Sequence, residues 1–529
     1  MTALVGTRHL VRLALRRDRI ILPIWTILFA VIPSSGARAY EQFYPTPADR
    51  ASLAAGGKNP SVNLVYGPTF DLTTAGGWTA WRYGLLMAVF VSLVAIFTVT
   101  RHTRAEEDTG RLELIGSTVV GRYAALTAGV LVAAGYSLVT GVLLALMLIG
   151  AGLGAGGAFA LGLGVASAGL VFTAVAAVAA QLTEYSRTAN GIASAALGVA
   201  FLLRAVGDSS SATWLSWLSP LGWATHIRPY AGERWWVLGL ALAFTVAVAS
   251  AAFVLLPRRD IGAGLLPARL GSPRAPAALS GPLGLAWRLQ RGSLIGWLIG
   301  LALVGAVFGS IANGIGDVVG DSQQVRDILA RMGGVSGLVD AFLASMTGLF
   351  GMLAAVYGVQ ATLRMRSEET AFRVEPLLAT GVGRLRWTAS HLAFGLLGTA
   401  ALLLAGGFFL GLTHGLRVGD VSGQVPSVLE GAVAQLPAAW LVTSLAIVLF
   451  GLLPRFATAV WALLAVFLLL SWFGPVMQLN QAILDLSPFA HIPRIPGHEL
   501  TATPLLWLTG LTAVALAAGL TGFRQRDIG

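Results

Sequence analysis

The stretch RAEEDTGRLELIGSTVVGR, residues 104–122, returns later in the chain as RSEETAFRVEPLLATGVGR, residues 366–384. The two copies align without a gap at an offset of 262 residues, and nine of their nineteen positions are identical. Each copy stands between long apolar segments, where a charged loop has to reach water. The chain therefore repeats a charged loop, and the repeat predicts two similar halves.

The composition is typical of a membrane protein. The chain has 529 residues, of which 56% are hydrophobic and 11% charged, whereas a soluble domain carries roughly 25% charged residues. Its 65 glycines suit close packing of helices in a bilayer. The absence of cysteine excludes disulfides and thiolate metal sites. We attribute the net charge of +11 to arginine-rich cytoplasmic loops rather than to nucleic-acid binding.

Twelve apolar stretches approach the length of about 20 residues that a membrane-spanning helix needs. They lie at about 20–37, 83–100, 124–150, 158–182, 188–206 and 236–256 in the first half, and at about 294–313, 344–363, 387–412, 429–453, 456–473 and 504–523 in the second. We expect an all-α integral membrane protein with twelve transmembrane helices in two six-helix repeats. The first repeat is expected at residues 1–256, a cytoplasmic linker at 257–282 and the second repeat at 283–529.

Two more internal matches support this division. RRDIG at 258–262 matches QRDIG at 525–529, and Leu-Ser-Pro at 218–220 matches Leu-Ser-Pro at 486–488. Because six spans is an even number, both halves begin and end on the same side, which predicts parallel repeats. Arginine clusters in the repeated loops and near both ends place these segments and both termini in the cytoplasm of a multi-pass protein of the cell membrane.

Three kinds of shorter helix are expected besides the spans. Arg8, Arg12 and Arg16 recur every four residues, which predicts an amphipathic helix along the inner leaflet, with a counterpart at 285–291. An ordinary positive flank, or a cleaved signal peptide, is the alternative at the amino terminus, where we expect a retained helix. Segments 214–223 and 488–497 are apolar but too short to span, so they are re-entrant helices on the outer side or interfacial loops. The repeated loops are the third kind.

The repeated loop carries acidic residues at helical spacing. Glu107 and Arg111 are four apart, a favourable pair within a helix, and Glu106 and Glu113 share a face. Such a helix could dock in the groove of a partner, whereas the alternative is a solvated turn. Recurrence favours docking, and two docking helices imply a two-fold partner. The residues assigned to docking are Arg104, Glu106, Glu107, Arg111 and Glu113, and in the second copy Arg366, Glu368, Glu369, Arg373 and Glu375.

The chain lacks the residues that would let it hydrolyse ATP through a P-loop. That motif needs Gly-x-x-x-x-Gly-Lys-Ser/Thr, but the only lysine, Lys58, has Ser52 in place of the first glycine and is followed by Asn59. We therefore expect a transport protein rather than an enzyme, with no catalytic residues and no metal ligands. His226, His491 and His498 are expected to be surface residues, because no carboxylate or cysteine accompanies them at ligand spacing.

The pattern Glu107-x-x-Gly110-x-x-Glu113, followed by Thr-Val-Val-Gly-Arg, resembles the coupling-helix signature of permease subunits of type-2 (type V-like) ABC exporters. The six spans, the amphipathic helix, the acidic helix between spans two and three and the re-entrant helices match that family as well. The fused duplication is similar to actinobacterial exporters of polyketide antibiotics. The resemblance covers essentially the whole chain, but the second copy departs from the signature, with Phe372 for Gly110 and Pro376 for Leu114.

The resemblance implies ATP-driven export by alternating access. Two copies of a separate nucleotide-binding ATPase subunit would bind ATP and Mg, and this chain would hold no cofactor. The cargo would be hydrophobic or amphipathic, as in multidrug efflux and antibiotic resistance. On this basis, replacing Glu107 and Glu369 with arginine is expected to uncouple ATP hydrolysis from transport while the chain stays folded.

The spans offer little charge for chemistry. Arg204 and Glu430 lie near predicted span ends, where snorkelling to the interface explains them. An aromatic cavity with few charges suits an amphipathic cargo. The candidate lining residues, each of which could serve packing instead, are Phe90, Phe201, Phe308, Phe350, Trp461 and Phe467.

The alternatives to a drug exporter are an exporter of lipid or glycolipid with the same architecture and a secondary twelve-span transporter, which would carry charges within the membrane. A membrane scaffold or membrane-embedded enzyme is a third class.

Overall fold

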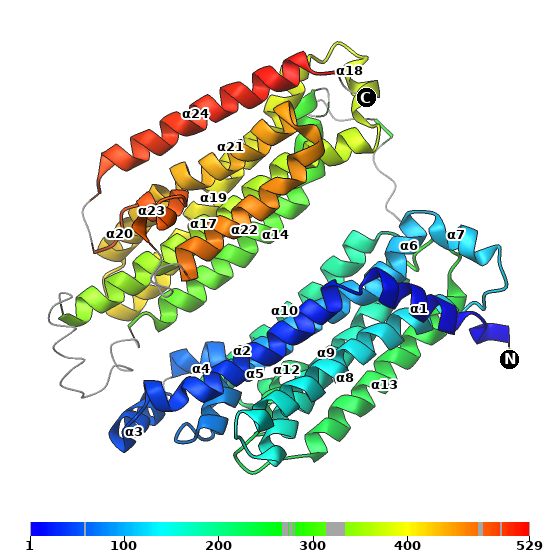
Figure 1. Cartoon of the computed structure of the whole chain (residues 1–529), viewed down its shortest axis with the longest axis vertical. Helices are drawn as coiled ribbons and strands as arrows, with labels where there is room; N and C mark the ends of the chain where they lie inside the picture. The colour runs from blue at the N-terminus through cyan, green and yellow to red at the C-terminus, as the bar shows by residue number, and fades with distance from the viewer. Residues whose placement is uncertain are drawn as a thin grey trace. The chain divides into compact units, whose positions relative to one another are not determined.

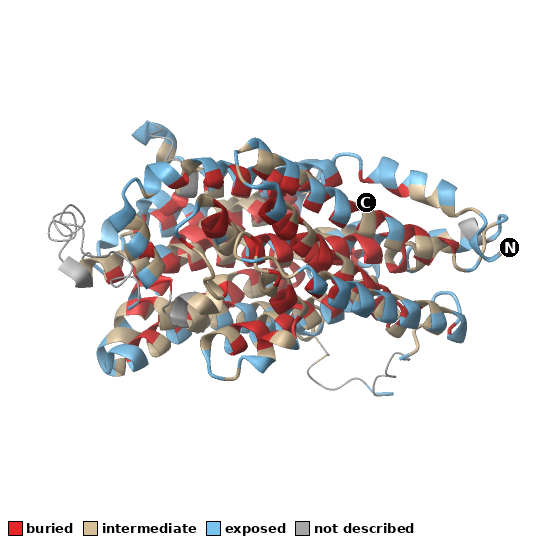
Figure 2. Ribbon diagram, turned by 90° about the horizontal axis from the view of Figure 1, so that it is seen from below, coloured by how far each residue is buried: buried red, intermediate tan, exposed pale blue. Residues whose placement is uncertain are grey.

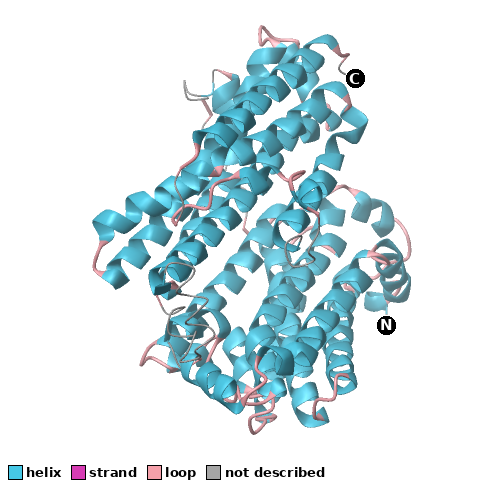
Figure 3. Cartoon of the chain, turned by 60° about the vertical axis from the view of Figure 1, so that its left-hand side comes forward, coloured by secondary structure: helices cyan, strands magenta, loops and turns pink. Residues whose placement is uncertain are grey.

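The structure is a computed structural model, and it describes residues 2–57, 60–266, 273–274, 279, 281–313, 334–473, 480–497 and 500–527. Within these residues the regular elements are helices joined by loops (Figure 3). Twelve helical segments in the described ranges are long and apolar enough to cross a membrane. The predicted all-α membrane fold is confirmed.

The described chain forms two compact units, which divide between residues 271 and 272 and are described separately (Figure 1). The first unit contains η1 (Thr2–Leu4), α1 (Thr7–Arg17), α2 (Ile21–Phe43), α3 (Pro47–Gly56), α4 (Pro60–Tyr66), α5 (Ala75–His102), α6 (Arg104–Asp108), α7 (Arg111–Gly116), α8 (Ala124–Gly150), α9 (Ala155–Leu182), α10 (Ser186–Ser209), α11 (Trp214–Trp217), α12 (Pro220–His226), α13 (Trp236–Leu255) and η2 (Leu256–Arg258). Its six spans are α2, α5, α8, α9, α10 and α13.

The second unit contains α14 (Pro282–Ile311), α17 (Gly334–Thr370), α18 (Val374–Leu378), α19 (Arg384–Val418), α20 (Val421–Ala434), α21 (Leu436–Leu452), η4 (Pro454–Ala459), α22 (Val460–Phe473), α23 (Gln481–Leu484), η5 (Pro488–His491) and α24 (Ala502–Gln525). Here the fourth span is the pair α20 and α21, and the fifth is η4 continued by α22. The linker expected at 257–282 lies partly outside the described residues.

Small residues let the spans of each unit pack closely. The span α9 is rich in alanine and glycine and is buried along most of its length between α5, α8 and α13. Buried residues lie mainly where helices pack against one another (Figure 2). A Cβ atom on Gly141 of α8 would lie 2.3 Å from the carbonyl oxygen of Gly162 in α9. Gly451 of α21 and Gly519 of α24 make the same kind of approach in the second unit, at 2.1 Å. Backbones in such contact leave no room for a side chain, as in membrane helix pairs.

Each unit has two ends. We call the end that carries the repeated loop the loop end, and the opposite one the far end; in the first unit α6 and α7 mark the loop end, and α3 and α4 the far end (Figure 1). At the far end, α12 packs on α5, α9 and α13, and its Trp223 is buried. A short helix enclosed by spans agrees with the re-entrant helix expected before the last span.

The Leu-Ser-Pro match makes the same contact in both units. The hydroxyl of Ser219 caps α12 and donates to the carbonyl of Ala200 in the fifth span at 2.6 Å. The hydroxyl of Ser487 donates to the carbonyl of Phe467, also in the fifth span, at 3.4 Å. This match therefore marks where the short far-end helix is attached to span five.

The amphipathic helices differ between the units, and one expectation is wrong. In the first unit α1 is a separate helix that ends at Asp18. The Asp18 carboxylate is buried and pairs with Arg101 at 2.8 Å and His102 at 2.5 Å, which fixes the bend before α2. In the second unit residues 285–291 form the start of the long helix α14, because no comparable break follows them.

Candidate functional site

The repeated loop of the first unit is two short helices rather than one. The helix α6 ends at Asp108, and α7 begins at Arg111 after Gly110. Gly110 has a φ of +70°, a left-handed conformation that glycine adopts without steric cost. Because this turn separates Glu107 from Arg111, the helical pair expected between them does not form, and Glu106 and Glu113 lie on different helices.

The second copy makes the same turn with a different residue. Phe372 occupies the position of Gly110, between α17 and α18, and its φ is +54°. A side chain in this conformation costs roughly 1–2 kcal/mol. The Phe372 ring is also 68% exposed. The turn is therefore kept in both halves although the second half has no glycine there.

Glu107 binds the segment that follows the last span of its own half. Its carboxylate accepts hydrogen bonds from Arg259 at 2.6 and 2.7 Å, from the Gly262 backbone at 3.1 Å and from the Arg104 guanidinium. The side chains of Glu107 and Arg259 are 5% and 4% exposed. Arg259 comes directly after the span that ends at Arg258. The pair thus joins the repeated loop to the sixth span.

Glu369, the counterpart of Glu107, forms the same pair in the second unit. Its carboxylate lies 2.7 Å from Arg526, which directly follows α24 and is the counterpart of Arg259 in the RDIG match. These two side chains are 16% and 15% exposed. We call Glu107–Arg259 and Glu369–Arg526 the loop–span ion pairs.

The arginine of each pair also contacts the fourth span. Arg259 Nε donates to Oε1 of Gln181, near the end of α9, at 2.8 Å. The Arg526 guanidinium lies over the ring of Phe450 in α21, 4.7 Å from its centroid, a favourable cation–π geometry. One arginine in each unit therefore connects the loop, the end of span six and the end of span four.

The last residue of the repeated loop makes a further contact that recurs. Arg122 donates to the carbonyls of Pro257 at 3.0 Å and Arg259 at 3.3 Å. Arg384, its counterpart, donates to the carbonyl of Arg526 at 2.7 Å. Carbonyls at the end of a helix lack partners within the helix, so a cation placed there is favourable. The start of span three is thereby attached to the end of span six in both units.

A third recurring contact lies within the loop itself. The carboxylate of Glu106 lies 3.8 Å from Arg111, and that of Glu368 lies 2.8 Å from Arg373. These pairs join the two sides of the left-handed turn, and they stabilise the turn that Gly110 and Phe372 allow.

Other contacts of the loop differ between the units. Glu106 also binds Arg17 of α1 at 2.6 Å, whereas Glu368 binds Arg364 of α17 at 2.9 Å. Arg104 is fully buried and donates to the carbonyl of Ala263 at 2.7 Å. Its counterpart Arg366 donates to the carbonyl of Pro454, the first residue of the fifth span. The recurring contacts are therefore a subset of those the loop makes.

Two of the repeated acidic residues stay on the surface. Glu113 in α7 and Glu375 in α18 are exposed. Among the described residues neither has an ion-pair partner. Five charged positions are assigned to docking in each half. Only the position of Glu113 and Glu375 is exposed in both copies and has no ion-pair partner among the described residues.

A cavity of about 460 Å³ lies beside the first loop–span ion pair, a size within the range of small-molecule sites. Its walls come from the loop, the start of α8, the end of α9 and the segment after α13, and include Leu112, Leu126, Gln181, Leu256 and Ile261. The charged residues in its wall include Glu107 and Arg259, which neutralise each other.

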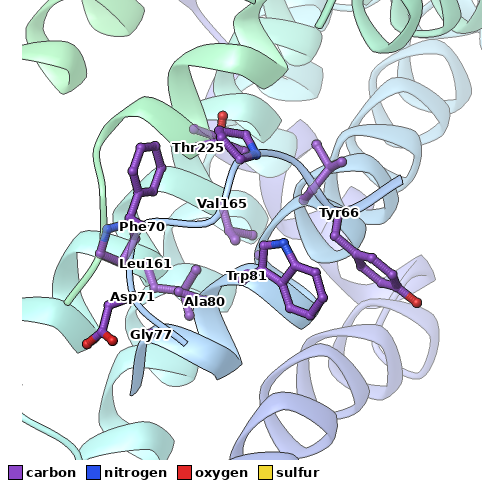
Figure 4. A pocket seen from close by; sticks show the side chains of 14 residues that line it. Tyr66, Phe70, Asp71, Gly77, Ala80, Trp81, Leu161, Val165 and Thr225 are labelled. Carbon is purple, nitrogen blue, oxygen red and sulfur yellow. The ribbon is translucent and has the colours of Figure 1, made fainter. Parts of the chain in front are cut away.

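A second cavity lies at the far end of the first unit (Figure 4). Tyr66 and Trp81 lie in its wall with ring centroids 4.8 Å apart, and Phe70, Leu161 and Thr225 also line it. Its volume is about 30 Å³, room for about one water molecule. In this conformation it is too small for a drug-sized compound.

The six aromatic residues predicted to line a substrate cavity lie apart from both of these cavities, and their role stays a prediction. In the first unit, Phe90 is 39% exposed and stacks on Phe29, and Phe201 lies under the Arg204 guanidinium. In the second unit, Phe350 and Phe467 are buried core residues, Phe308 packs against Phe342, and Trp461 is 39% exposed.

Two interpretations of polar residues at the far end need correction. Arg204 does not snorkel: it is fully buried, pairs with Asp208 at 3.3 Å and donates to the carbonyls of Asn63 and Leu64 in α4. His226 is not a plain surface residue, because its ring stacks on Trp217 at 4.4 Å. Arg204 attaches α4 to the fifth span, and His226 joins the short helices α12 and α11.

Sequence reasoning missed the arginines of the loop–span ion pairs. The internal match of residues 258–262 with 525–529 contains Arg259 and Arg526, but by itself it assigns neither of them a partner. The signal that could have found them is complementary charge: an acidic loop and a basic segment recur together, once in each half. Two matches that always occur together are candidates for mutual contact.

Comparison with known proteins gives the family. The chain is 48% identical over 527 residues to the multidrug efflux system permease protein Rv1217c of Mycobacterium tuberculosis, covering 99% of this chain and 95% of that protein. A family model described as the C-terminal domain of the multidrug efflux system permease Rv1217c matches residues 279–524. The predicted resemblance to a drug-exporter permease is thereby confirmed. The prediction of a membrane transport protein is confirmed as well. The chain belongs to the family of multidrug efflux permeases that includes Rv1217c.

Proposed function

We propose that the chain is the transmembrane subunit of an ATP-driven ABC exporter that moves hydrophobic or amphipathic compounds out of the cell by alternating access. The observation that carries this proposal is its 48% identity, along 99% of its length, with a permease named for multidrug efflux. The ATP would be bound with Mg²⁺ by two copies of a separate ATPase subunit, since the only lysine of the chain does not lie in a P-loop. The two permease repeats would be residues 1–256 and 283–529.

The loop end is the proposed docking surface for these ATPase subunits, and it would face the cytoplasm together with both termini. Glu113 and Glu375 support this, because their carboxylates are exposed in both units. Exposed apolar groups accompany them: Val119 is 86% exposed and Phe372 68% exposed. Exposed apolar side chains rimmed by charge are typical of protein interfaces.

The proposed cargo is of the antibiotic and drug-like class, with polyketides as its first candidates. The described spans present few ionisable groups, and Arg204 in α10 is neutralised by Asp208. A pathway without free charge suits compounds that partition into lipid.

The energy source is tested in inside-out membrane vesicles that contain the chain together with the ATPase that co-purifies with it. Uptake of ethidium is expected to need ATP and to continue when a protonophore removes the proton gradient. Uptake that proceeds without ATP and stops with the protonophore would instead identify a secondary transporter. Stimulation of ATP hydrolysis by drugs or by lipids then distinguishes the two cargo classes.

Docking is tested by reversing the exposed charges. The double variant Glu113→Arg/Glu375→Arg is expected to reduce co-purification of the ATPase at least about tenfold, the effect of about 1.4 kcal/mol in binding. Asp485→Arg is the control, because it makes the charge change of each single substitution at an exposed far-end residue. Equal recovery of the ATPase with all three proteins would contradict docking at these carboxylates.

A further inference from the structure

The loop–span ion pairs join segments that are distant in the chain. Glu107 and Arg259 are 152 residues apart, and Glu369 and Arg526 are 157 residues apart. Both pairs form between counterpart residues of two separate internal matches. A contact that both units make in the same way, between segments that both units retain, indicates a common role.

A contribution to stability does not by itself explain why the loop–span contacts are made by charged residues. A buried ion pair loses hydration on both partners, and apolar residues of similar size often stabilise a protein equally well. A guanidinium that binds a carboxylate through two nitrogens does fix orientation, however. Arg259 binds Glu107 through both terminal nitrogens and Gln181 through Nε, so its position relative to the loop and to α9 is closely defined.

We propose that Glu107, Arg259, Glu369 and Arg526 are positioning residues for transport, and that each loop–span ion pair makes the repeated loop and the sixth span of its half move as one body. This rests on the proposed function, in which the ATPase moves the loops. Glu113 is exposed in α7, and Glu107 lies at the end of α6, on the other side of the Gly110 turn. A displacement applied at Glu113 therefore reaches Arg259 through the start of α7, the turn, the end of α6 and one ion pair. The sixth span then follows the loop without movement having to pass through spans three to five.

The second unit offers the cleaner test, because Glu369 has Arg526 as its ion-pair partner whereas Glu107 also binds Arg104. The chain has no cysteine, so introduced cysteines are unique sites for spin labels. Ala379→Cys in the loop and Gln525→Cys at the end of α24 are exposed positions for one label pair. Ala371→Cys with Ala379→Cys forms a control pair within the loop, and both are measured by double electron–electron resonance on the purified full chain.

The expected result is specific to the pair of labels. Arg526→Ala and Glu369→Gln are each expected to at least double the width of the distance distribution between residues 379 and 525, while the distribution between 371 and 379 is unchanged. Arg526→Lys, which keeps the charge, and the exchange Glu369→Arg/Arg526→Glu are expected to restore a narrow distribution. A 379–525 distribution that stays narrow in Arg526→Ala, or an exchange variant as broad as the single variants, would overturn the proposal. Broadening of both distributions would overturn it too, since the loop itself would then have unfolded.

Transport supplies the second readout, with ethidium uptake into vesicles and ATPase co-purification measured on the same preparations. Arg526→Ala is expected to lower ATP-dependent uptake at least tenfold with normal ATPase recovery, and Arg526→Lys to recover most of it. Normal uptake in Arg526→Ala would overturn a positioning role in transport. If the unmodified protein shows no ATP-dependent uptake, the proposed energy source fails, whereas the label distances still report whether the loop and the span are joined.

Discussion

The loop ends of the two units use the same pairs of residues but bury them to different depths. In the first unit Glu107 is 5% exposed and binds two arginines, whereas in the second Glu369 is 16% exposed and binds one. Glu106 of the first loop also binds Arg17 of α1, whereas Glu368 of the second binds Arg364 of α17, the helix that leads into its loop. The attachment of the loop to span six is common to both units, while its other attachments differ.

This comparison separates two roles for the repeated acidic residues. Those with recurring partners, such as Glu107 and Glu369, serve contacts within their unit. Glu113 and Glu375, which have no ion-pair partner among the described residues, are the ones proposed to dock the ATPase subunits. Recurrence of a charged loop in a duplicated chain is thus explained in part by internal ion pairs, so recurrence alone does not distinguish docking from contacts within the unit.

The largest difference between the units is expected from removing the acidic partner. Glu107→Ala leaves Arg104 and Arg259 buried without a counter-charge, so we expect a loss of about 3–5 kcal/mol in stability. Glu369→Ala is expected to lose less, because Arg526 is partly solvated and also held by aromatic rings. Thermal unfolding of the purified variants measures both, with Glu113→Ala as the control at an exposed site. Equal losses at 107 and 369 would show that burial depth does not separate the units. On the same grounds Glu107→Arg is expected to destabilise the chain as well, because it would bury a third cation beside Arg104 and Arg259.

Acid is expected to weaken the far end of the first unit more than that of the second. Burial, with smaller contributions from Arg228 and Arg234, lowers the pKa of His226 to about 4. The unfolded chain takes up this proton near pH 6.5, so the contribution of His226 to stability is complete above pH 6.5 and is lost as the pH falls toward 4. Between pH 7 and pH 5 we expect a loss of roughly 1–2 kcal/mol. In the second unit the residue at the same distance from the Leu-Ser-Pro match is Arg494, so this position carries no histidine.

Thermal unfolding at pH 7 and pH 5 checks this effect, and His226→Gln is its control. The variant is expected to lose less stability than the unmodified chain over the same pH interval. An identical loss in both proteins would assign the acid sensitivity to other groups.

A smaller difference in stability between the units is expected at Ser219 and Ser487, the serines that attach the short far-end helices to span five. Ser219→Ala removes a helix cap and a 2.6 Å hydrogen bond to span five, for which we expect a loss of about 1 kcal/mol. Ser487→Ala removes a 3.4 Å bond to the Phe467 carbonyl and a 2.8 Å bond with the Ser471 hydroxyl, but η5 has no side-chain cap to lose, so its effect is expected to be smaller. Unfolding temperatures of the two single variants give the comparison directly, and a larger effect at 487 would reverse it.

The smallest effects are expected at the left-handed turns, and they have opposite signs. Phe372→Gly relieves an unfavourable conformation and is expected to stabilise the chain by at most about 1 kcal/mol, because glycine also increases the freedom of the unfolded chain. Gly110→Ala is expected to destabilise by about 1 kcal/mol through the backbone alone, since no atom lies within 4 Å of the added Cβ. Thermal unfolding again provides the measurement. A destabilising Phe372→Gly would indicate that the exposed ring makes a contact of its own.

The sequence predicted most of the fold because hydropathy and internal matches report it directly. All twelve spans lie where apolar runs of sufficient length lie, and the Leu-Ser-Pro and RDIG matches fall at equivalent places in the two units. Helix junctions were harder. The separate α1 depends on the buried contacts of Asp18 with Arg101 and His102, which come from a segment more than eighty residues away.

The candidate site was predictable in its location but not in its pairing. Spacing along a helix suggested that Glu107 binds Arg111, yet Gly110 interrupts the helix and Glu107 turns to Arg259. Local spacing assumes a continuous helix, and a single residue with positive φ removes that assumption. The partner of a buried charge can then lie anywhere in the chain, and only the joint recurrence of two matches restricts the choice.

The distance along the chain between the partners of each loop–span ion pair also bears on how the protein is made. At 5–20 residues per second, the 152 residues that separate Glu107 from Arg259 take about 8–30 s to synthesise. During that time Glu107 has left the ribosome and its arginine has not, so the first loop waits in its unpaired state until the sixth span has been inserted. The first half can then complete its own ion pair before the second loop is translated, because neither partner comes from the second half.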